Sequence, residues 1–188
     1  NLPGDGVPFN GGLTDQDFAL VCRNCVAPAP PGRHGSGRVA PAGPAPIQVN
    51  VDEQGLNIAG DAANEPSLAV DVDDPSHLVM AWRQFDSVTS EHRTAGWATS
   101  VDGGCSWHVG GAIGGDVFRS DPVLAALGDG RFAYVGLADG FESVDVFLSD
   151  DGGTSWTAGG PAFGGDKPWM TADASRDALY LSWDDVPS

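Results

Sequence analysis

One eight-residue pattern occurs twice in this chain, and it constrains the possible fold more than any other feature. The copies are SVDGGCSW at residues 100–107 and SDDGGTSW at residues 149–156. Both follow the pattern S-x-D-x-G-x-S-W, and they begin 49 residues apart, at positions 100 and 149. A period of this size is typical of a fold built from one recurring supersecondary unit, and a four-stranded propeller blade fits it best.

The residue types in the pattern predict a tight turn between two β-strands. An aspartate in a turn can accept hydrogen bonds from backbone N–H groups a few residues further on. The glycine two positions later can adopt a positive φ, and the tryptophan restarts the strand and buries a large ring under the turn. We therefore interpret the motif residues as folding elements and not as an active site: Ser100, Asp102, Gly104, Trp107, Ser149, Asp151, Gly153 and Trp156.

Both copies resemble the Asp-box, or BNR repeat, of bacterial sialidases and related propellers, at every motif position. The resemblance covers residues 64–185. It implies an all-β fold, an Asp-box β-propeller of four-stranded antiparallel blades, with the boxes at the turns between the third and fourth strands. It does not settle activity, because one fold serves several functions.

A second repeat lies in register with the boxes and consists of a proline, an apolar strand, a polar turn and another apolar strand. It begins at Pro66, Pro122 and Pro168. The pattern predicts blades over about 64–114 and 120–164 and half a blade over 166–185. Because two and a half blades cannot close a ring, we expect the chain to be an N-terminal piece of a longer polypeptide that supplies the rest of the propeller.

Residues 1–46 differ in composition from the partial propeller predicted over 47–188. They hold eight of the 14 prolines and predict a poorly ordered linker, followed by a candidate strand over 47–51. The Cys22-x-x-Cys25 pair could be a metal half-site, a redox pair or a local disulfide, and we favour a structural disulfide or two free thiols. Cys105 occupies a variable position of the first box, and we expect no chemistry from it.

The net charge of −17, with Lys167 as the single lysine, argues against nucleic acid or an anionic membrane as the main partner. No apolar run is long enough to insert into a bilayer, and we expect a secreted or extracytoplasmic protein. No P-loop, dinucleotide fingerprint, serine nucleophile elbow or clustered histidine set is present, so the sequence predicts no cofactor and no metal. We expect four tryptophans to lie in the blade core: Trp82, Trp97, Trp169 and Trp183.

Polar residues gather where the innermost strands begin, which is where a propeller opens its central channel. As substrate-binding residues we predict Arg119, Lys167, Arg83 and Glu65. Asp121 or Asp86 is the candidate general acid/base. The alternative is that these side chains form inter-blade salt bridges and turn caps.

Sialidases, as a family, bind the substrate carboxylate with three arginines and use a tyrosine nucleophile, activated by a glutamate, with an aspartate as acid/base. The nearest match to the family's Phe-Arg-Ile-Pro motif is FRSDP at 118–122, which aligns Arg119 with the first arginine. The resemblance implies hydrolysis of terminal sialic acid or a related acidic sugar, with a glycan or glycoconjugate as partner. Two alternatives stay open: a non-catalytic propeller that binds glycan or protein, and a polysaccharide hydrolase that uses paired carboxylates.

Overall fold

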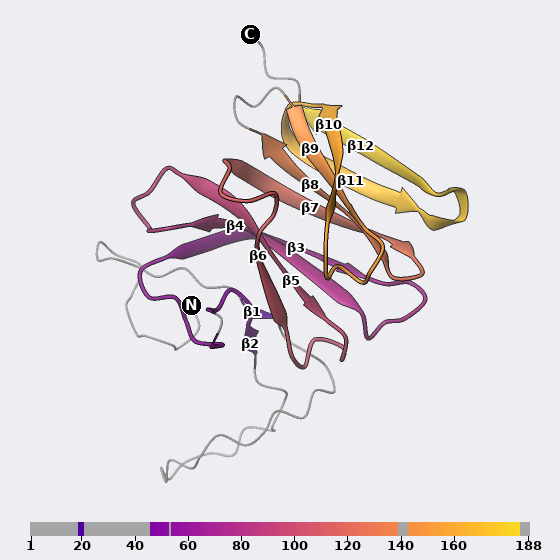
Figure 1. Ribbon diagram of the computed structural model, residues 1–188. Coiled ribbons are helices and arrows are strands. Elements are labelled where there is room, and N and C mark those ends of the chain that lie inside the picture. The colour runs from indigo at the N-terminus through magenta and orange to yellow at the C-terminus, as the bar shows by residue number, and fades with distance from the viewer. Residues whose placement is uncertain (1–18, 21–45, 53, 139–142, 185–188) are drawn as a thin grey trace, which may run out of the picture.

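The computed structural model describes residues 19–20, 46–52, 54–138 and 143–184, and this part of the chain is all-β (Figure 1). Two antiparallel four-stranded sheets follow each other along the sequence, and a two-stranded sheet comes after them. The first sheet contains β3 (Ala62–Val70), β4 (Leu78–Phe85), β5 (Arg93–Ser100) and β6 (His108–Ala112). The second contains β7 (Arg119–Gly128), β8 (Arg131–Ala138), β9 (Ser143–Ser149) and β10 (Thr157–Phe163).

The third sheet pairs β11 (Asp166–Asp173) with β12 (Ala178–Asp184) across a short 3-10 turn, η1 (Ala174–Arg176). In each sheet the strands follow chain order, so neighbouring strands are joined by simple turns. The strands predicted within 64–185 are confirmed, including the third strand of each four-stranded unit.

A small separate sheet pairs β1 (Ala19–Leu20) with β2 (Ile47–Gln48). The strand predicted over 47–51 is therefore shorter than expected, because the backbone folds back where Val51 forms an isolated bridge with Asn57. The predicted linker lies mostly outside the described residues, as do Cys22 and Cys25.

The three main sheets pack face to face, and side chains from facing strands fill the space between them. Between the first and second sheets the core includes Val79, Trp97, Phe132 and Tyr134, all at most 7% exposed. A second cluster fills the space between the second sheet and β11–β12. This packing brings the first strands of the three sheets, β3, β7 and β11, next to one another (Figure 1).

Both octapeptides form the predicted turn between the third and fourth strands of their sheets. In the first copy Asp102 Oδ1 accepts hydrogen bonds from the backbone N–H groups of Cys105 at 2.9 Å and Ser106 at 2.8 Å. In the second copy Asp151 Oδ1 accepts the N–H of Ser155 at 2.9 Å. The motif glycines have φ values of +85° and +82°. Turn chemistry alone therefore accounts for the conserved spacing of Asp and Gly between the two copies.

We expect Asp102→Ala and Asp151→Ala each to lower the free energy of unfolding by about 1–3 kcal/mol, because several turn donors lose their acceptor. Urea titration of the purified chain measures this change. Asp150→Ala, at a variable position of the second turn, is the matched control and should have a much smaller effect. If all three variants unfold at the same urea concentration as wild type, the turn carboxylates do not stabilise the fold.

Cys105 takes part in a disulfide, and its partner lies outside the described residues. The prediction that this cysteine carries no chemistry is therefore wrong. Cys105 takes part in the hydrogen bonds of the turn through its backbone N–H, and the residue is exposed, so a position that varies between the two octapeptides can hold a cross-link.

Candidate functional site

Each of the first strands contains a bulge at the residue that precedes its proline. Glu65, Asp121 and Lys167 have φ values of +52°, +47° and +52°, and the strand register shifts at all three places. A left-handed backbone costs a residue with a Cβ about 1–2 kcal/mol, and bulges re-aim side chains out of the regular pleat. The same local distortion thus presents one charged side chain from each of three neighbouring sheets.

These side chains meet around Asp121, which is only 8% exposed. Lys167 Nζ donates a hydrogen bond to Asp121 Oδ2 at 2.9 Å, and Ser120 Oγ donates to Asp121 Oδ1 at 2.9 Å. Arg83 from β4 reaches the same group, with Nη1 at 3.8 Å from Asp121 Oδ1 and Nη2 at 3.1 Å from Glu65 Oε1. We call Glu65, Arg83, Asp121 and Lys167 the charged cluster.

The two carboxyl groups of the cluster have opposite pKa shifts. Burial raises the pKa of Glu65 to about 7, and the hydrogen bond with Asp121 and the negative charge of Asp121 add to this effect. Burial also acts to raise the pKa of Asp121, but hydrogen bonds with Glu65, Lys167 and Ser120 outweigh it and lower that pKa to about 2. The pair therefore keeps one proton up to near-neutral pH, and Glu65 holds it.

The raised pKa of Glu65 makes stability depend on pH. The folded protein keeps a proton that the unfolded chain releases above the ordinary pKa of 4.5, so this stabilisation is complete below pH 4.5 and is lost as the pH rises through about 7.

We expect Glu65→Gln, which keeps a neutral donor beside Asp121, to unfold about 2–4 °C above wild type at pH 8 and to remove most of the pH dependence between 4.5 and 7. Thermal unfolding at several pH values tests this. The exposed Glu91→Gln should follow the wild-type curve, and a Glu65→Gln curve that also follows it would refute the shared proton.

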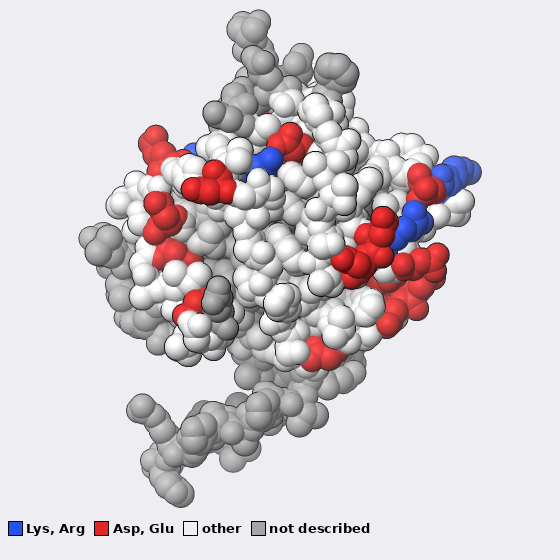
Figure 2. All heavy atoms as spheres, in the orientation of Figure 1, with Lys and Arg blue, Asp and Glu red and all other residues white. Residues whose placement is uncertain are grey.

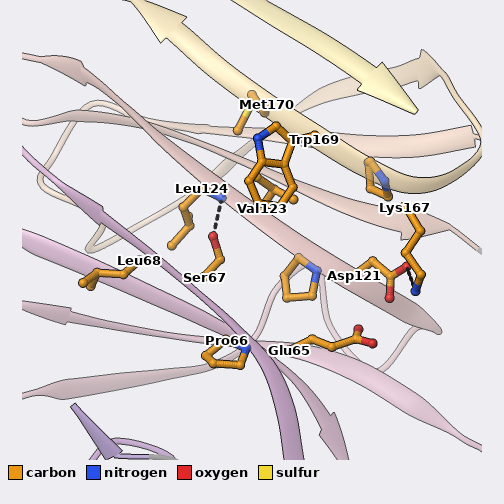
Figure 3. A pocket seen from close by; sticks show the side chains of 12 residues that line it. Glu65, Pro66, Ser67, Leu68, Asp121, Val123, Leu124, Lys167, Trp169 and Met170 are labelled. Carbon is orange, nitrogen blue, oxygen red and sulfur yellow. Dashed lines mark hydrogen bonds and ion pairs between the residues drawn. The ribbon is translucent and has the colours of Figure 1, made fainter. Parts of the chain in front are cut away.

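A pocket of about 680 Å³ opens beside the charged cluster and is lined by residues of β3, β7 and β11. Figure 3 shows Glu65, Asp121 and Lys167 grouped toward one end of it, and Leu68, Leu124 and Met170 away from that end. Trp169 also lines the pocket and is 71% exposed. The pocket therefore combines a hydrogen-bonding end with apolar walls and an accessible indole ring.

The structure brings together four of the six predicted site residues, namely those of the charged cluster. Arg119 points elsewhere: it is 6% exposed, donates to Asp145 Oδ2 at 2.6 Å and stacks on Phe147. Asp86, at the end of β4, is exposed and lines a different cleft on the first sheet. Neither lines the pocket beside the charged cluster.

The four tryptophans divide into two groups. Trp82 and Trp97 are 2% and 7% exposed, as predicted for the core. Trp169 and Trp183 are 71% and 44% exposed, so the prediction is wrong for them. Met170, next to Trp169, is 5% exposed and fills the core, which leaves Trp169 on the open side. Side chains alternate between the two faces of a strand, so only one of these neighbours can face the core, and the residue types do not say which.

The charged cluster also uses basic side chains that are scarce in this acidic protein. Of the six Lys and Arg residues in the described ranges, five form ion pairs with Asp or Glu. Figure 2 shows one face of the molecule, on which acidic side chains predominate and basic ones lie beside them. Two of these scarce cations, Arg83 and Lys167, converge on one carboxylate, so the local charge at the site differs from that of the whole chain.

Comparison with models of known protein families found no family that matches this sequence. A search of the curated proteins found no match either. No helix in the described ranges is long and apolar enough to cross a membrane. The geometry of the site and the repeated turn are therefore the features that bear on function.

Proposed function

We propose that the chain forms part of a sialidase-like β-propeller and binds carbohydrate in the pocket beside the charged cluster. The observation that carries this proposal is the convergence of Glu65, Asp121 and Lys167 from equivalent bulges of three sheets on one pocket. Two features support the propeller: face-to-face stacking of successive four-stranded antiparallel sheets, and octapeptide turns at the same place in both.

The chemistry of the pocket suits a sugar. Sugar hydroxyl groups both donate and accept hydrogen bonds, which matches a neutral Glu65, an ionised Asp121 and a lysine placed side by side. The exposed ring of Trp169 offers a flat surface for the apolar face of a sugar ring. Sites of this type join apolar walls to a few placed polar groups.

An acidic sugar is the substrate class that the local charge favours. With Glu65 protonated, the cluster holds two positive groups, Arg83 and Lys167, and one negative group, Asp121. The net charge of the cluster is then +1, whereas the net charge of the whole chain is −17. Lys167 is the most exposed charged group of the cluster, at 60% of its side chain, and is placed to meet a ligand carboxylate. The disulfide at Cys105 supports an extracytoplasmic location, because disulfides persist in oxidising compartments.

Hydrolysis of terminal sialic acid is the second candidate, and the raised pKa of Glu65 favours it, since a general acid works best with a pKa near the working pH. A paired-carboxylate mechanism fits the geometry less well. Asp121 raises the pKa of Glu65 directly, so the two carboxyls interact closely, whereas glycosidase carboxyls stand about 5–9.5 Å apart with the sugar between them. Arg119, which the resemblance aligns with a substrate-binding arginine, is already paired with Asp145.

Titration calorimetry with N-acetylneuraminic acid, and turnover of a fluorogenic sialoside, test the proposal on the purified chain. We expect binding that Trp169→Ala weakens about tenfold, because the stacking surface is removed. Trp183→Ala removes an exposed tryptophan of β12 that does not line the pocket and is the matched control. Binding without turnover supports a non-catalytic propeller, whereas equal affinity in wild type and Trp169→Ala would exclude this pocket as the sugar site.

A further inference from the structure

A second cleft, of about 670 Å³, lies on the first sheet away from the pocket of the charged cluster. It is lined by residues of β4, β5 and β6 and by five residues that precede β3: Asn50, Val51, Asp52, Ile58 and Asp61. Trp82 and Gln84 of β4 line the cleft. Ala81, their neighbour on the opposite face of the strand, belongs to the core shared with the second sheet. The cleft thus lies on the face of the first sheet that the second sheet does not cover.

The floor of this cleft is apolar and held in place. A Cβ on Gly96 of β5 would overlap the Trp82 indole, so the glycine lets the ring lie flat against the strand. The indole Nε1 donates to Gln84 Oε1 at 2.7 Å, which fixes the ring in its plane. Ile58 and Val109 add further apolar wall.

The polar part of the lining is rich in acceptors and strongly acidic. Neither Lys nor Arg is among the described lining residues of the cleft. Four aspartates line it: Asp52, Asp61, Asp86 and Asp116. Asp61 is 3% exposed, and its Oδ2 accepts a hydrogen bond from Gln84 Nε2 at 2.6 Å. His92, whose Nε2 lies 3.0 Å from Asp116 Oδ1, is the one other titratable side chain of the described lining.

Asn50 gives an independent indication of a ligand. Its side chain is buried in the cleft wall, with the residue 1% exposed, and neither Oδ1 nor Nδ2 has a hydrogen-bond partner within the described structure. A buried amide without hydrogen-bond partners lowers the stability of the folded protein by about 1–3 kcal/mol. A ligand that carries hydrogen-bonding groups would recover part of this cost.

We propose that this cleft binds a small organic cation, with an ammonium group directed to the carboxylates and an apolar body against Ile58 and Val109, above the buried Trp82 ring. An ammonium group offers only donors, which matches a rim made of acceptors. A metal ion suits the cleft less well, because the described residues contain no group of three or more His, Cys, Asp or Glu side chains placed to hold one. This site is separate from the proposed carbohydrate pocket and does not depend on it.

Phenethylamine and its neutral analogue 2-phenylethanol are suitable probes, since they differ mainly in the ammonium group. Calorimetry and ¹⁵N-¹H NMR of the chain should show that the amine binds at least about tenfold more tightly than the alcohol. We expect the NMR shifts at residues 50–61, 82–86 and 109–112, and weaker binding at high salt. N-acetylneuraminic acid should not displace the amine, which separates this site from the carbohydrate pocket.

Asp86→Asn combined with Asp116→Asn removes two carboxylates at exposed positions of the rim and should weaken amine binding about tenfold. Asp129→Asn combined with Asp150→Asn changes the net charge equally, at exposed positions of the second sheet, and should leave the affinity unchanged. Equal affinity for the amine and the alcohol, shifts confined to the other pocket, or no binding of the amine would each overturn the proposal. The first and last of these outcomes are read on wild type alone, so the test stands even where a variant folds poorly.

Discussion

Arg119→Ala is expected to lower the free energy of unfolding by about 3–5 kcal/mol, because it removes a buried guanidinium that is packed on Phe147 and paired with Asp145, whose side chain is 30% exposed. Arg119 is 6% exposed, and its Nη2 lies 2.6 Å from Asp145 Oδ2. Its guanidinium also stacks on Phe147, with Cζ 5.1 Å from the ring centroid. Substitution by alanine therefore removes a charge partner and packed volume together. Chemical denaturation of the purified variant measures the loss.

The ion pair spans the middle of the second sheet and crosses β8 at a glycine. Arg119 lies on β7 and Asp145 on β9, with β8 between them. Gly136 on β8 is the register partner of Asp145, and a Cβ there would lie 3.4 Å from Arg119 Cδ. The arginine thus crosses β8 where side-chain bulk is missing. Arg119 therefore links β7 to β9 across β8. For its contribution to stability, the burial of the guanidinium matters more than the N–O distance of the ion pair.

Arg131→Ala is the control for this point. Its Nη1 also lies 2.6 Å from a carboxylate, that of Asp177, but the two side chains are 32% and 69% exposed. Exposed pairs contribute little, so we expect a much smaller change than for Arg119→Ala. If Arg119→Ala instead keeps full stability and loses sialoside turnover, Arg119 acts on substrate, and the ion pair with Asp145 is incidental.

The sequence predicts strands and turns well because these depend on nearby residues. The spacing of Asp102 and Gly104, repeated at Asp151 and Gly153, is sufficient to place both turns, and the prolines mark where each sheet begins. Three members of the charged cluster, Glu65, Asp121 and Lys167, are predictable for the same reason, since each directly precedes a proline. Their meeting depends only on equivalent strands lying next to one another.

Arg119 and Trp169 could not be placed in this way. Arg119 is two residues before Asp121, yet the bulge between Ser120 and Val123 separates the directions of the two side chains. Which of them faces the pocket depends on backbone conformation that residue types do not specify. Trp169 appears apolar and core-like in sequence, but Met170 takes the core position. Orientation within a strand and its bulges, rather than the identity of the strand, limits the prediction of the site.

Gly153→Ala should be the second most damaging of the substitutions considered, lowering the free energy of unfolding by about 2–5 kcal/mol. Gly153 has φ +82°, which costs an alanine about 1–2 kcal/mol. A Cβ there would also overlap Val79 Cγ2 of the first sheet, and overpacking of this type adds about 1–3 kcal/mol. The turn cannot easily move away, because Thr99 Oγ1 of the first sheet donates to the Gly152 carbonyl at 2.8 Å.

Gly103→Ala separates the backbone cost of a positive φ from the steric cost of the overlap with Val79. Gly103 lies in the first octapeptide turn with φ +74°, but a Cβ there would have no atom within 4 Å. We therefore expect only the backbone cost, about 1–2 kcal/mol. Combining Gly153→Ala with Val79→Ala should cost less than the sum of the two single changes, because the truncated valine leaves room for the new methyl group. Strict additivity would mean that the second turn does not press on the first sheet, and that its glycine is required for backbone conformation alone.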